Sequence, residues 1–163
     1  EMSASLVGSE MCIRDSSYGC PVSKSALEQQ FILNLTKDPY FLTKNLCFLG
    51  QIENNSSEDI DDSALVYKSP KGLVIITGCS HSGIINIIEY AKKVTGSNKI
   101  FAVVGGLHLL DMKQSKIKEI ISYLKKEKVE FLYPCHCCDL KSKIVMAQEL
   151  EIKEVCSGDS ISF

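Results

Sequence analysis

The stretch KGLVIITGCSHSGIINIIEYAKK, residues 71–93, changes its pattern at the middle. Residues 72–77 are an apolar run rich in β-branched side chains, which is typical of a buried strand. Beyond "TGCSHSG", apolar residues recur at the spacing of one helix face, at Ile84, Ile87, Ile88, Ala91 and Val94. The stretch therefore predicts a strand, a glycine-flanked loop and an amphipathic helix. The loop holds His81, one of only three histidines in the chain.

The same order of strand, loop and helix is predicted twice more. Residues 100–104 read as a buried strand, followed by "GGLH" and a helix that Ser115 caps. Residues 129–133 read as the next strand, which Pro134 ends, and "CHCCD" leads into a third helix. The apolar stripe of the second helix is Ile117, Ile120, Ile121 and Leu124, and that of the third is Leu140, Ile144, Ala147 and Leu150.

The segments outside these units are predicted to extend the same domain. Residues 63–69 and 72–77 flank "PKG" and predict a hairpin. Residues 45–52 predict a further strand, and residues 53–62 a polar loop. Residues 160–163 predict a short final strand.

Repeated strand–helix alternation predicts an α/β fold with parallel strands and right-handed crossovers. Parallel strands place their following loops at one edge of the sheet, which is where ligand sites form in α/β proteins. Each of the three loops holds one histidine: His81, His108 and His136. Imidazole is the commonest metal ligand in proteins. We therefore expect the three histidines to contribute to a shared site for a divalent metal.

Composition limits the classes of partner. The chain has 163 residues, 45% of them hydrophobic, and a net charge of −2, which fits one globular domain. This charge gives no electrostatic basis for binding nucleic acid, and no apolar run approaches a membrane span. The eight cysteines are irregularly spaced and follow no export signal, so we expect a reducing, cytoplasmic location. The oligomeric state is left open.

Three motifs carry a resemblance to a known family. "KGLVIITGCSHSGIINIIEYAKK", "FAVVGGLHLL" and "FLYPCHC" resemble the C-terminal half of metallo-β-lactamase-fold hydrolases, in the branch related to dihydropterin–ribofuranosylaminobenzene phosphate synthase. The resemblance runs from about Leu46 to Phe163. It implies the C-terminal half of a four-layer αβ/βα sandwich of α/β class, with a dinuclear metal site at the edge of its sheets.

The family's motif His-x-His-x-Asp-His is absent from the 163 residues. We therefore expect residues 17–163 to be a partial domain that lacks its N-terminal half and is inactive alone. Residues 1–16, "EMSASLVGSEMCIRDS", resemble the read-through of a sequencing-library adapter and are expected not to be native.

The resemblance implies roles for individual residues. His136 in "YPCHC" matches the last ligand motif of the fold. Cys79 stands where relatives place a metal-bridging aspartate or cysteine, and His81 belongs to the "GCSH" signature of the branch. His108, in "GGxH", either ligates metal or contacts substrate. Where relatives often read Cys-Thr-Gly, this chain reads Cys137, Cys138 and Asp139.

The chemistry that the resemblance implies is hydrolysis of a small-molecule substrate by a metal-activated water that attacks a carbonyl or phosphoryl centre. Two ions are expected in the full-length protein, with zinc favoured and iron or manganese open. Asp61, Asp62 and Asp111 are either ligands, partners of a ligating histidine, or solvated loop carboxylates, and we favour the last. No residue is identified as the catalytic acid or base.

A second hypothesis assigns "CHCC" and Cys79 to a structural-zinc or thiol-redox binding module. The spacing of Cys135, Cys137 and Cys138 fits no Cys-x-x-Cys pairing, and adjacent cysteines rarely share one tetrahedral ion. The hydrolase is therefore the preferred interpretation.

Overall fold

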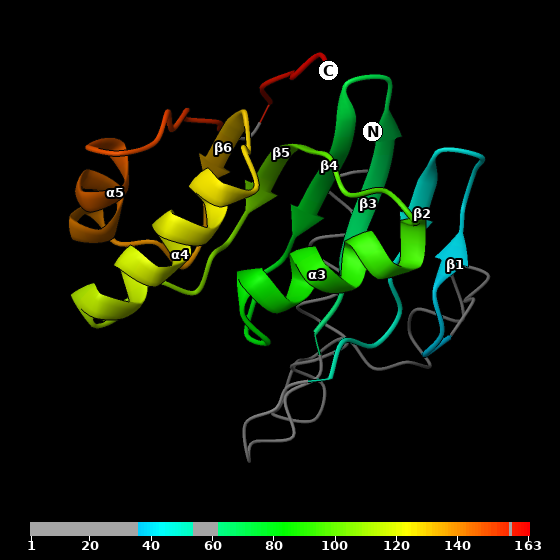
Figure 1. The fold of residues 1–163 in the computed structure, drawn as a ribbon, viewed down its shortest axis with the longest axis horizontal. Coiled ribbons are helices and arrows are strands. Elements are labelled where there is room, and N and C mark those ends of the chain that lie inside the picture. The colour runs from blue at the N-terminus through cyan, green and yellow to red at the C-terminus, as the bar shows by residue number, and fades with distance from the viewer. Residues whose placement is uncertain (1–35, 54–61, 157) are drawn as a thin grey trace. The chain divides into compact units, whose positions relative to one another are not determined.

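The structure is a computed structural model that describes residues 36–53, 62–156 and 158–163 (Figure 1). The described part of the chain belongs, apart from Thr36, to one compact unit, Lys37–Phe163. The expectations for residues 1–16 and for Asp61 fall outside the described residues, as does most of the polar loop at residues 53–62.

A single sheet organises this unit. Its strands are β1 (Tyr40–Phe41), β2 (Leu46–Phe48), β3 (Ala64–Ser69), β4 (Gly72–Thr77), β5 (Ile100–Gly105) and β6 (Phe131–Pro134). They lie side by side in the order of the chain. The pairs from β1 to β4 are antiparallel, whereas β4, β5 and β6 are parallel. The predicted hairpin and the three parallel strands are thus confirmed.

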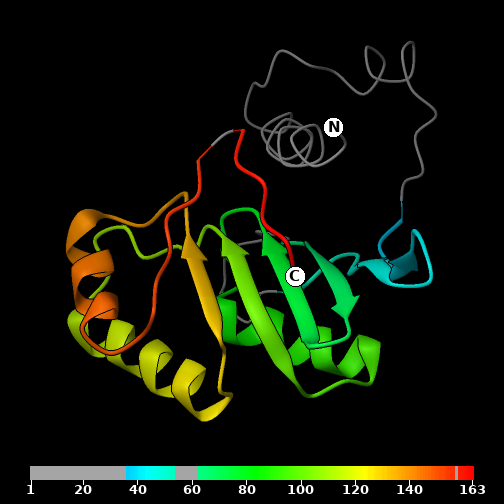
Figure 2. The ribbon, with the colours of Figure 1, turned by 90° about the horizontal axis from the view of Figure 1, so that it is seen from above.

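The helices α3 (Ile84–Thr95) and α4 (Gln114–Lys126) connect the parallel strands and cover one face of the sheet (Figures 1 and 2). The helix α5 (Leu140–Ala147) follows β6 and lies beside α4. The predicted stripes of α3 and α4 are buried at Ile84, Ile87, Ile88, Ala91, Ile117, Ile120, Ile121 and Leu124. Burying a large aliphatic side chain stabilises the folded state by about 1.5–3 kcal/mol, so the packing of α3 and α4 on the sheet contributes a large part of the stability.

The opposite face of the sheet carries a second, smaller cluster. Val74, Phe101 and Ala102 are buried there, and Phe163 at the end of the chain packs against them. The rings of Phe101 and Phe163 meet edge to face, with centroids 6.1 Å apart. Side chains of β4 and β5 are therefore packed on both sides of the sheet, which explains why these strands read as continuous apolar runs.

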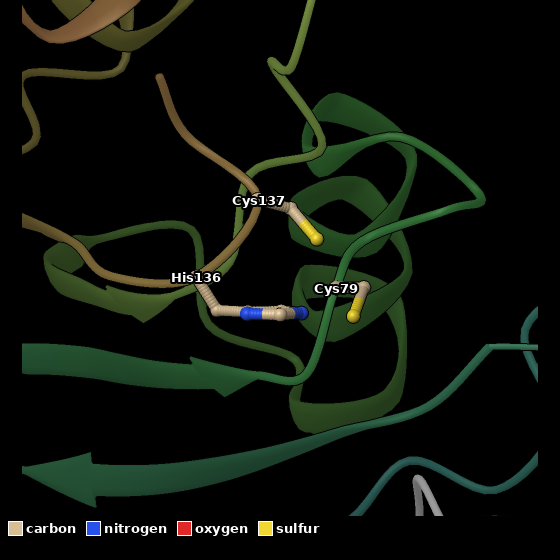
Figure 3. Close-up of side chains that lie close together, drawn as sticks. All are labelled: Cys79, His136 and Cys137. Atoms are coloured by element: carbon tan, nitrogen blue, oxygen red, sulfur yellow. The ribbon is translucent and has the colours of Figure 1, made fainter. Parts of the chain in front are cut away.

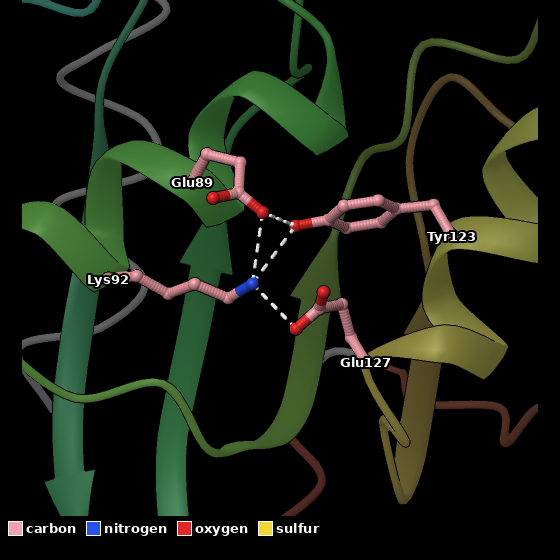
Figure 4. A network of polar contacts seen from close by, with 4 residues as sticks. All are labelled: Glu89, Lys92, Tyr123 and Glu127. Carbon is pink, nitrogen blue, oxygen red and sulfur yellow. Dashed lines mark hydrogen bonds and ion pairs between the residues drawn. The ribbon is translucent and has the colours of Figure 1, made fainter.

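A polar network links α3 to α4 (Figure 4). The Lys92 ammonium lies 2.5 Å from Glu127 and 2.9 Å from Glu89, and Tyr123 donates a hydrogen bond to Glu89. Burial opposes the charge on Lys92, but its hydrogen bonds to Glu127 and Glu89 outweigh that effect and raise its pKa. The hydrogen bond from Tyr123, followed by that from Lys92, lowers the pKa of Glu89.

The third helix was predicted with the wrong face. Leu140 and Ile144, assigned to its apolar stripe, are 74% and 52% exposed. Ser142 and Met146 are buried instead, because the Ser142 hydroxyl donates to the carbonyl of Leu109 at 2.9 Å. A polar residue that bonds inward breaks the apolar pattern from which the face was inferred.

Other element boundaries also differ from expectation. The strand predicted over 45–52 is only Leu46–Phe48, and the short strand β1 was not predicted. Lys113, not Ser115, precedes α4, so Ser115 lies within the first turn. Residues 160–163 form no strand, because Phe163 contributes to the second cluster through its side chain rather than through backbone pairing. Within the described ranges, no helix has the length and apolarity needed to cross a membrane.

Candidate metal centre

The three loops that follow β4, β5 and β6 are joined to one another by backbone hydrogen bonds. The N–H of Gly106 donates to the carbonyl of Gly78 at 2.8 Å, and the N–H of Cys135 donates to that of Gly105 at 2.9 Å. The N–H of Leu109 donates to the carbonyl of Cys137 at 2.7 Å. The loop after β5 is therefore hydrogen-bonded to the loops on both sides of it, and the three loops together are called the loop frame below.

Gly106 lies where the three loops meet. A Cβ atom at this position would stand 2.4 Å from the Gly78 carbonyl oxygen, 2.8 Å from that of His136 and 3.1 Å from the Cα of Cys79. Thr77 and Ser80 both donate their hydroxyls to the Gly106 carbonyl. Only glycine leaves room for such an approach of three backbones, which explains the second glycine of "GGLH".

This convergence brings together Cys79, His136 and Cys137 (Figure 3). One ring nitrogen of His136 and the two sulfur atoms all lie within 4.8 Å of one another. Cys79 and Cys137 are half-buried, whereas His136 is exposed. In Figure 3 the imidazole points towards Cys79, and the sulfur of Cys137 faces the same space. A nitrogen and two sulfur atoms are a donor set that fits zinc.

The other two histidines form a separate contact. The rings of His81 and His108 meet edge to face, with centroids 4.6 Å apart and planes at 75°. Both lie in loops of the same sheet edge, yet neither belongs to the group of three. The expectation that His81 and His136 share one pocket stays a prediction.

Cys137 was not among the ligands expected for the hydrolase site, and only the second hypothesis included it, together with the other thiols of "CHCC". Its sequence signal was only its place beside His136, and its neighbour Cys138 offered the same signal. The structure separates the two thiols, because Cys137 adopts a left-handed backbone conformation with φ of 54°. Ser80 and His108 do the same in the other two loops, with φ of 62° and 49°. Non-glycine residues in this region carry strain of about 1–3 kcal/mol, and such strain is concentrated at functional sites.

The remaining thiols differ in their surroundings. None of the six described cysteines forms a disulfide. Burial raises the pKa of both Cys135 and Cys138, which favours their neutral thiol forms. Cys138 packs against the main core, and Cys135 donates to the carbonyl of Tyr133 at 3.2 Å.

The preference for solvated carboxylates is wrong for Asp62. Only 8% of Asp62 is exposed, and its carboxylate accepts hydrogen bonds from the backbone N–H and the hydroxyl of Ser82 at 3.0 and 3.1 Å. Asp62 thus holds the turn that follows His81. Asp111 is exposed, as expected, and its N–H donates to Asp139 at 3.3 Å.

Comparison with known proteins gives relatives in sequence and in structure. The chain is 29% identical over 153 residues to 7,8-dihydropterin-6-methyl-4-(β-D-ribofuranosyl)-aminobenzene-5′-phosphate synthase of Methanocaldococcus jannaschii, covering 79% of this chain and 52% of the relative. It is 28% identical over 142 residues to an uncharacterized protein of the same organism, covering 77% of this chain and 52% of that protein. The chain thus spans about half the length of the curated relatives it matches. No family model matches the chain.

One solved structure that resembles this chain is a metal-dependent hydrolase of the β-lactamase superfamily. The two structures superpose with a TM-score of 0.68 at 27% sequence identity, covering 82% of this chain and 58% of the other. Its fold and the name of the first curated relative agree with the motifs in the sequence. The resemblance to metallo-β-lactamase-fold hydrolases, in the branch related to dihydropterin–ribofuranosylaminobenzene phosphate synthase, is therefore confirmed, and the α/β sheet described above is part of that fold.

Proposed function

We propose that the whole protein is a metal-dependent hydrolase and that the present residues supply one side of its metal site. The observation that supports this most directly is the convergence of the three loops at Gly106, which places Cys79, His136 and Cys137 within 4.8 Å of one another. The similarity to a metal-dependent hydrolase over 82% of this chain supports the general kind of activity.

Within this proposal, His136 and Cys79 hold a divalent metal, and His81 and His108 complete the site or contact the substrate. Nitrogen and sulfur donors suit zinc better than manganese, and iron is the other metal they accommodate. A second ion belongs to the whole protein, with ligands from outside the present residues. When bound, the metal supplies a Lewis acid that lowers the pKa of a water ligand towards about 7.

The residues around the site position and restrict this chemistry. Asp62 fixes the turn after His81 by accepting both hydrogen bonds of Ser82. The edge-to-face contact of His108 with His81 sets the direction of both rings. The exposure of His136 gives a substrate access to the site from solvent.

The proposed substrate is a small molecule that is attacked at a carbonyl or phosphoryl centre. The curated relative is named a synthase for a phosphorylated dihydropterin compound, so phosphorylated pterin-type molecules join simple esters as the substrates to test. The described cysteines form no disulfide, which supports a reducing compartment, and we place the protein in the cytoplasm.

The test uses the whole protein, purified with its native metal. Wild type and the variants His136→Ala and Cys138→Ala are compared for bound metal and for hydrolysis of chromogenic phosphate and carboxylate esters. We expect His136→Ala to lose both metal and turnover, whereas Cys138→Ala keeps both. Retention of turnover in metal-free His136→Ala would refute the proposal.

The alternative of a structural-zinc or thiol-redox module is supported by the approach of two thiols to His136. A closed structural site has four protein ligands and resists exchange, whereas a catalytic site keeps a position open. The group of three donors among the described residues favours the catalytic type of site, with one position open. A metal that stays bound during prolonged chelation, in a protein without hydrolase activity, would instead favour the module.

A further inference from the structure

We propose that Cys79, His136 and Cys137 together bind one metal ion through two thiolates and one imidazole, with the fourth coordination position of that ion left open by these three residues. Cys137 is thereby assigned as a metal ligand. The assignment stands on the geometry of three side chains, and it holds whether or not the whole protein is a hydrolase.

The distances require only a small closure. Two sulfur atoms and one imidazole nitrogen bound tetrahedrally to zinc lie about 3.5–3.8 Å apart, as follows from Zn–S bonds of about 2.3 Å and Zn–N bonds of about 2.0–2.1 Å. The three donor atoms are already within 4.8 Å of one another. Rotation about the side-chain bonds of His136 and the two cysteines provides the remaining 1 Å or so, without movement of the backbone.

The backbone positions the two thiols independently of a metal. The carbonyl of Cys137 accepts the N–H of Leu109, and the Cα of Cys79 lies against Gly106. Cys137 has a left-handed conformation, at φ of 54°, and its sulfur faces the same space as Cys79 and His136 (Figure 3), whereas Cys138 packs against the main core. Strain of this kind persists where the surrounding structure imposes it, and its result here is that a sulfur atom faces Cys79 and His136.

The donor set determines which metal is taken. Soft thiolate ligands select zinc over the harder manganese and magnesium ions, and cobalt(II) takes the same tetrahedral sites. Two thiolates and one imidazole leave one of four positions for water or substrate. The group has three donors among the described residues, one fewer than the four protein ligands of a closed structural zinc.

Cobalt(II) alone is the probe, because a thiolate bound to cobalt gives a near-ultraviolet charge-transfer band that imidazole and carboxylate ligands do not give. The full 163-residue chain is reduced, freed of metal and titrated with cobalt(II). We expect one cobalt(II) per chain, a charge-transfer band, displacement by equimolar zinc and no displacement by a tenfold excess of manganese. Cys79→Ser and Cys137→Ser should each lose about half of the band and bind cobalt(II) at least about tenfold more weakly.

Two further variants separate ligation from folding. Cys138→Ser changes the neighbouring thiol, which packs against the core, and should keep the full band. His136→Ala changes an exposed side chain, so it should keep the fold while its affinity for cobalt(II) falls. Circular dichroism of each metal-free variant shows whether the fold is retained.

Binding of cobalt(II) without a charge-transfer band overturns the assignment, as does a band that survives in the double variant of Cys79 and Cys137. An effect of Cys138→Ser equal to that of Cys137→Ser in folded protein also overturns it. Absence of ester hydrolysis by the whole protein, with the band present, refutes the hydrolase proposal and leaves this one standing.

Discussion

Replacement of Gly106 by alanine tests whether the loop frame determines the site. The added Cβ would stand 2.4 Å from the carbonyl oxygen of Gly78, about 0.6 Å inside the 3.0 Å at which such contacts normally stop. A second clash, at 2.8 Å, involves the carbonyl oxygen of His136. Both obstacles are backbone atoms of neighbouring loops, so no side-chain rotation relieves them.

The expected cost follows from these contacts. Overpacking of a tight site costs about 1–3 kcal/mol. The loop shift also weakens the hydrogen bond from the Gly106 N–H to Gly78, now 2.8 Å long, which adds about 1 kcal/mol. Gly106→Ala should therefore lower the free energy of unfolding by about 2–4 kcal/mol. It should also separate Cys79 from His136 and so weaken cobalt(II) binding.

Urea unfolding and cobalt(II) titration measure the two effects. Gly96→Ala is the matched control, because Gly96 has a positive φ of 68° but no atom within 4 Å of an added Cβ. That change should cost about 1 kcal/mol through backbone conformation and leave cobalt(II) binding unaltered. A Gly106→Ala protein with wild-type stability and an unchanged charge-transfer band would show that the loops do not meet at this glycine.

Three further outcomes are expected. His136→Ala should change the free energy of unfolding by no more than about 0.5 kcal/mol in urea while abolishing metal binding, and a large loss of stability would contradict its exposed position. Asp62→Ala should lower the free energy of unfolding by about 1–3 kcal/mol, because the backbone N–H and the hydroxyl of Ser82 lose their acceptor. Asp111→Ala, at an exposed position, should leave the free energy of unfolding nearly unchanged, and equal effects of the two changes would contradict the role of Asp62 in the turn at Ser82. The hydrogen bond from Tyr123 lowers the pKa of Glu89. The ionised Glu89 therefore stabilises the fold above the ordinary glutamate pKa, and this stabilisation is lost as the pH falls through the lowered pKa. Urea unfolding from pH 7 to pH 3 should show the loss in the wild type but not in Glu89→Gln.

The sequence predicts the fold well where one physical rule dominates. Burial on both faces makes β4 and β5 continuous apolar runs, and the stripes of α3 and α4 follow from one-sided packing on a sheet. Parallel order then requires the loops after these strands to share an edge. The positions of His81, His108 and His136 at that edge were therefore predictable without coordinates.

The grouping of the side chains was not predictable, because it depends on single backbone angles. The left-handed φ of Cys137 decides which of two adjacent thiols faces His136, and no periodicity encodes it. The pairing of His81 with His108 likewise arises from loop conformation. In α5, the inward hydrogen bond of Ser142 replaced the apolar contact on which the expected face relied. The two-residue strand β1 exists only through its pairing with β2, and so it has no local signal.

The backbone ties around Gly106 have a consequence for how this site can change over evolution. The loops hold one another through main-chain groups, and the side chains of Cys79, His136 and Cys137 contribute none of those hydrogen bonds. In the proposed metal site, the loop conformation therefore does not depend on which side chains are the ligands. One substitution can replace a thiolate by a carboxylate or an imidazole while the backbone hydrogen bonds between the loops remain. Lineages built on this edge are free to change their preferred metal, and with it their reaction, in single steps.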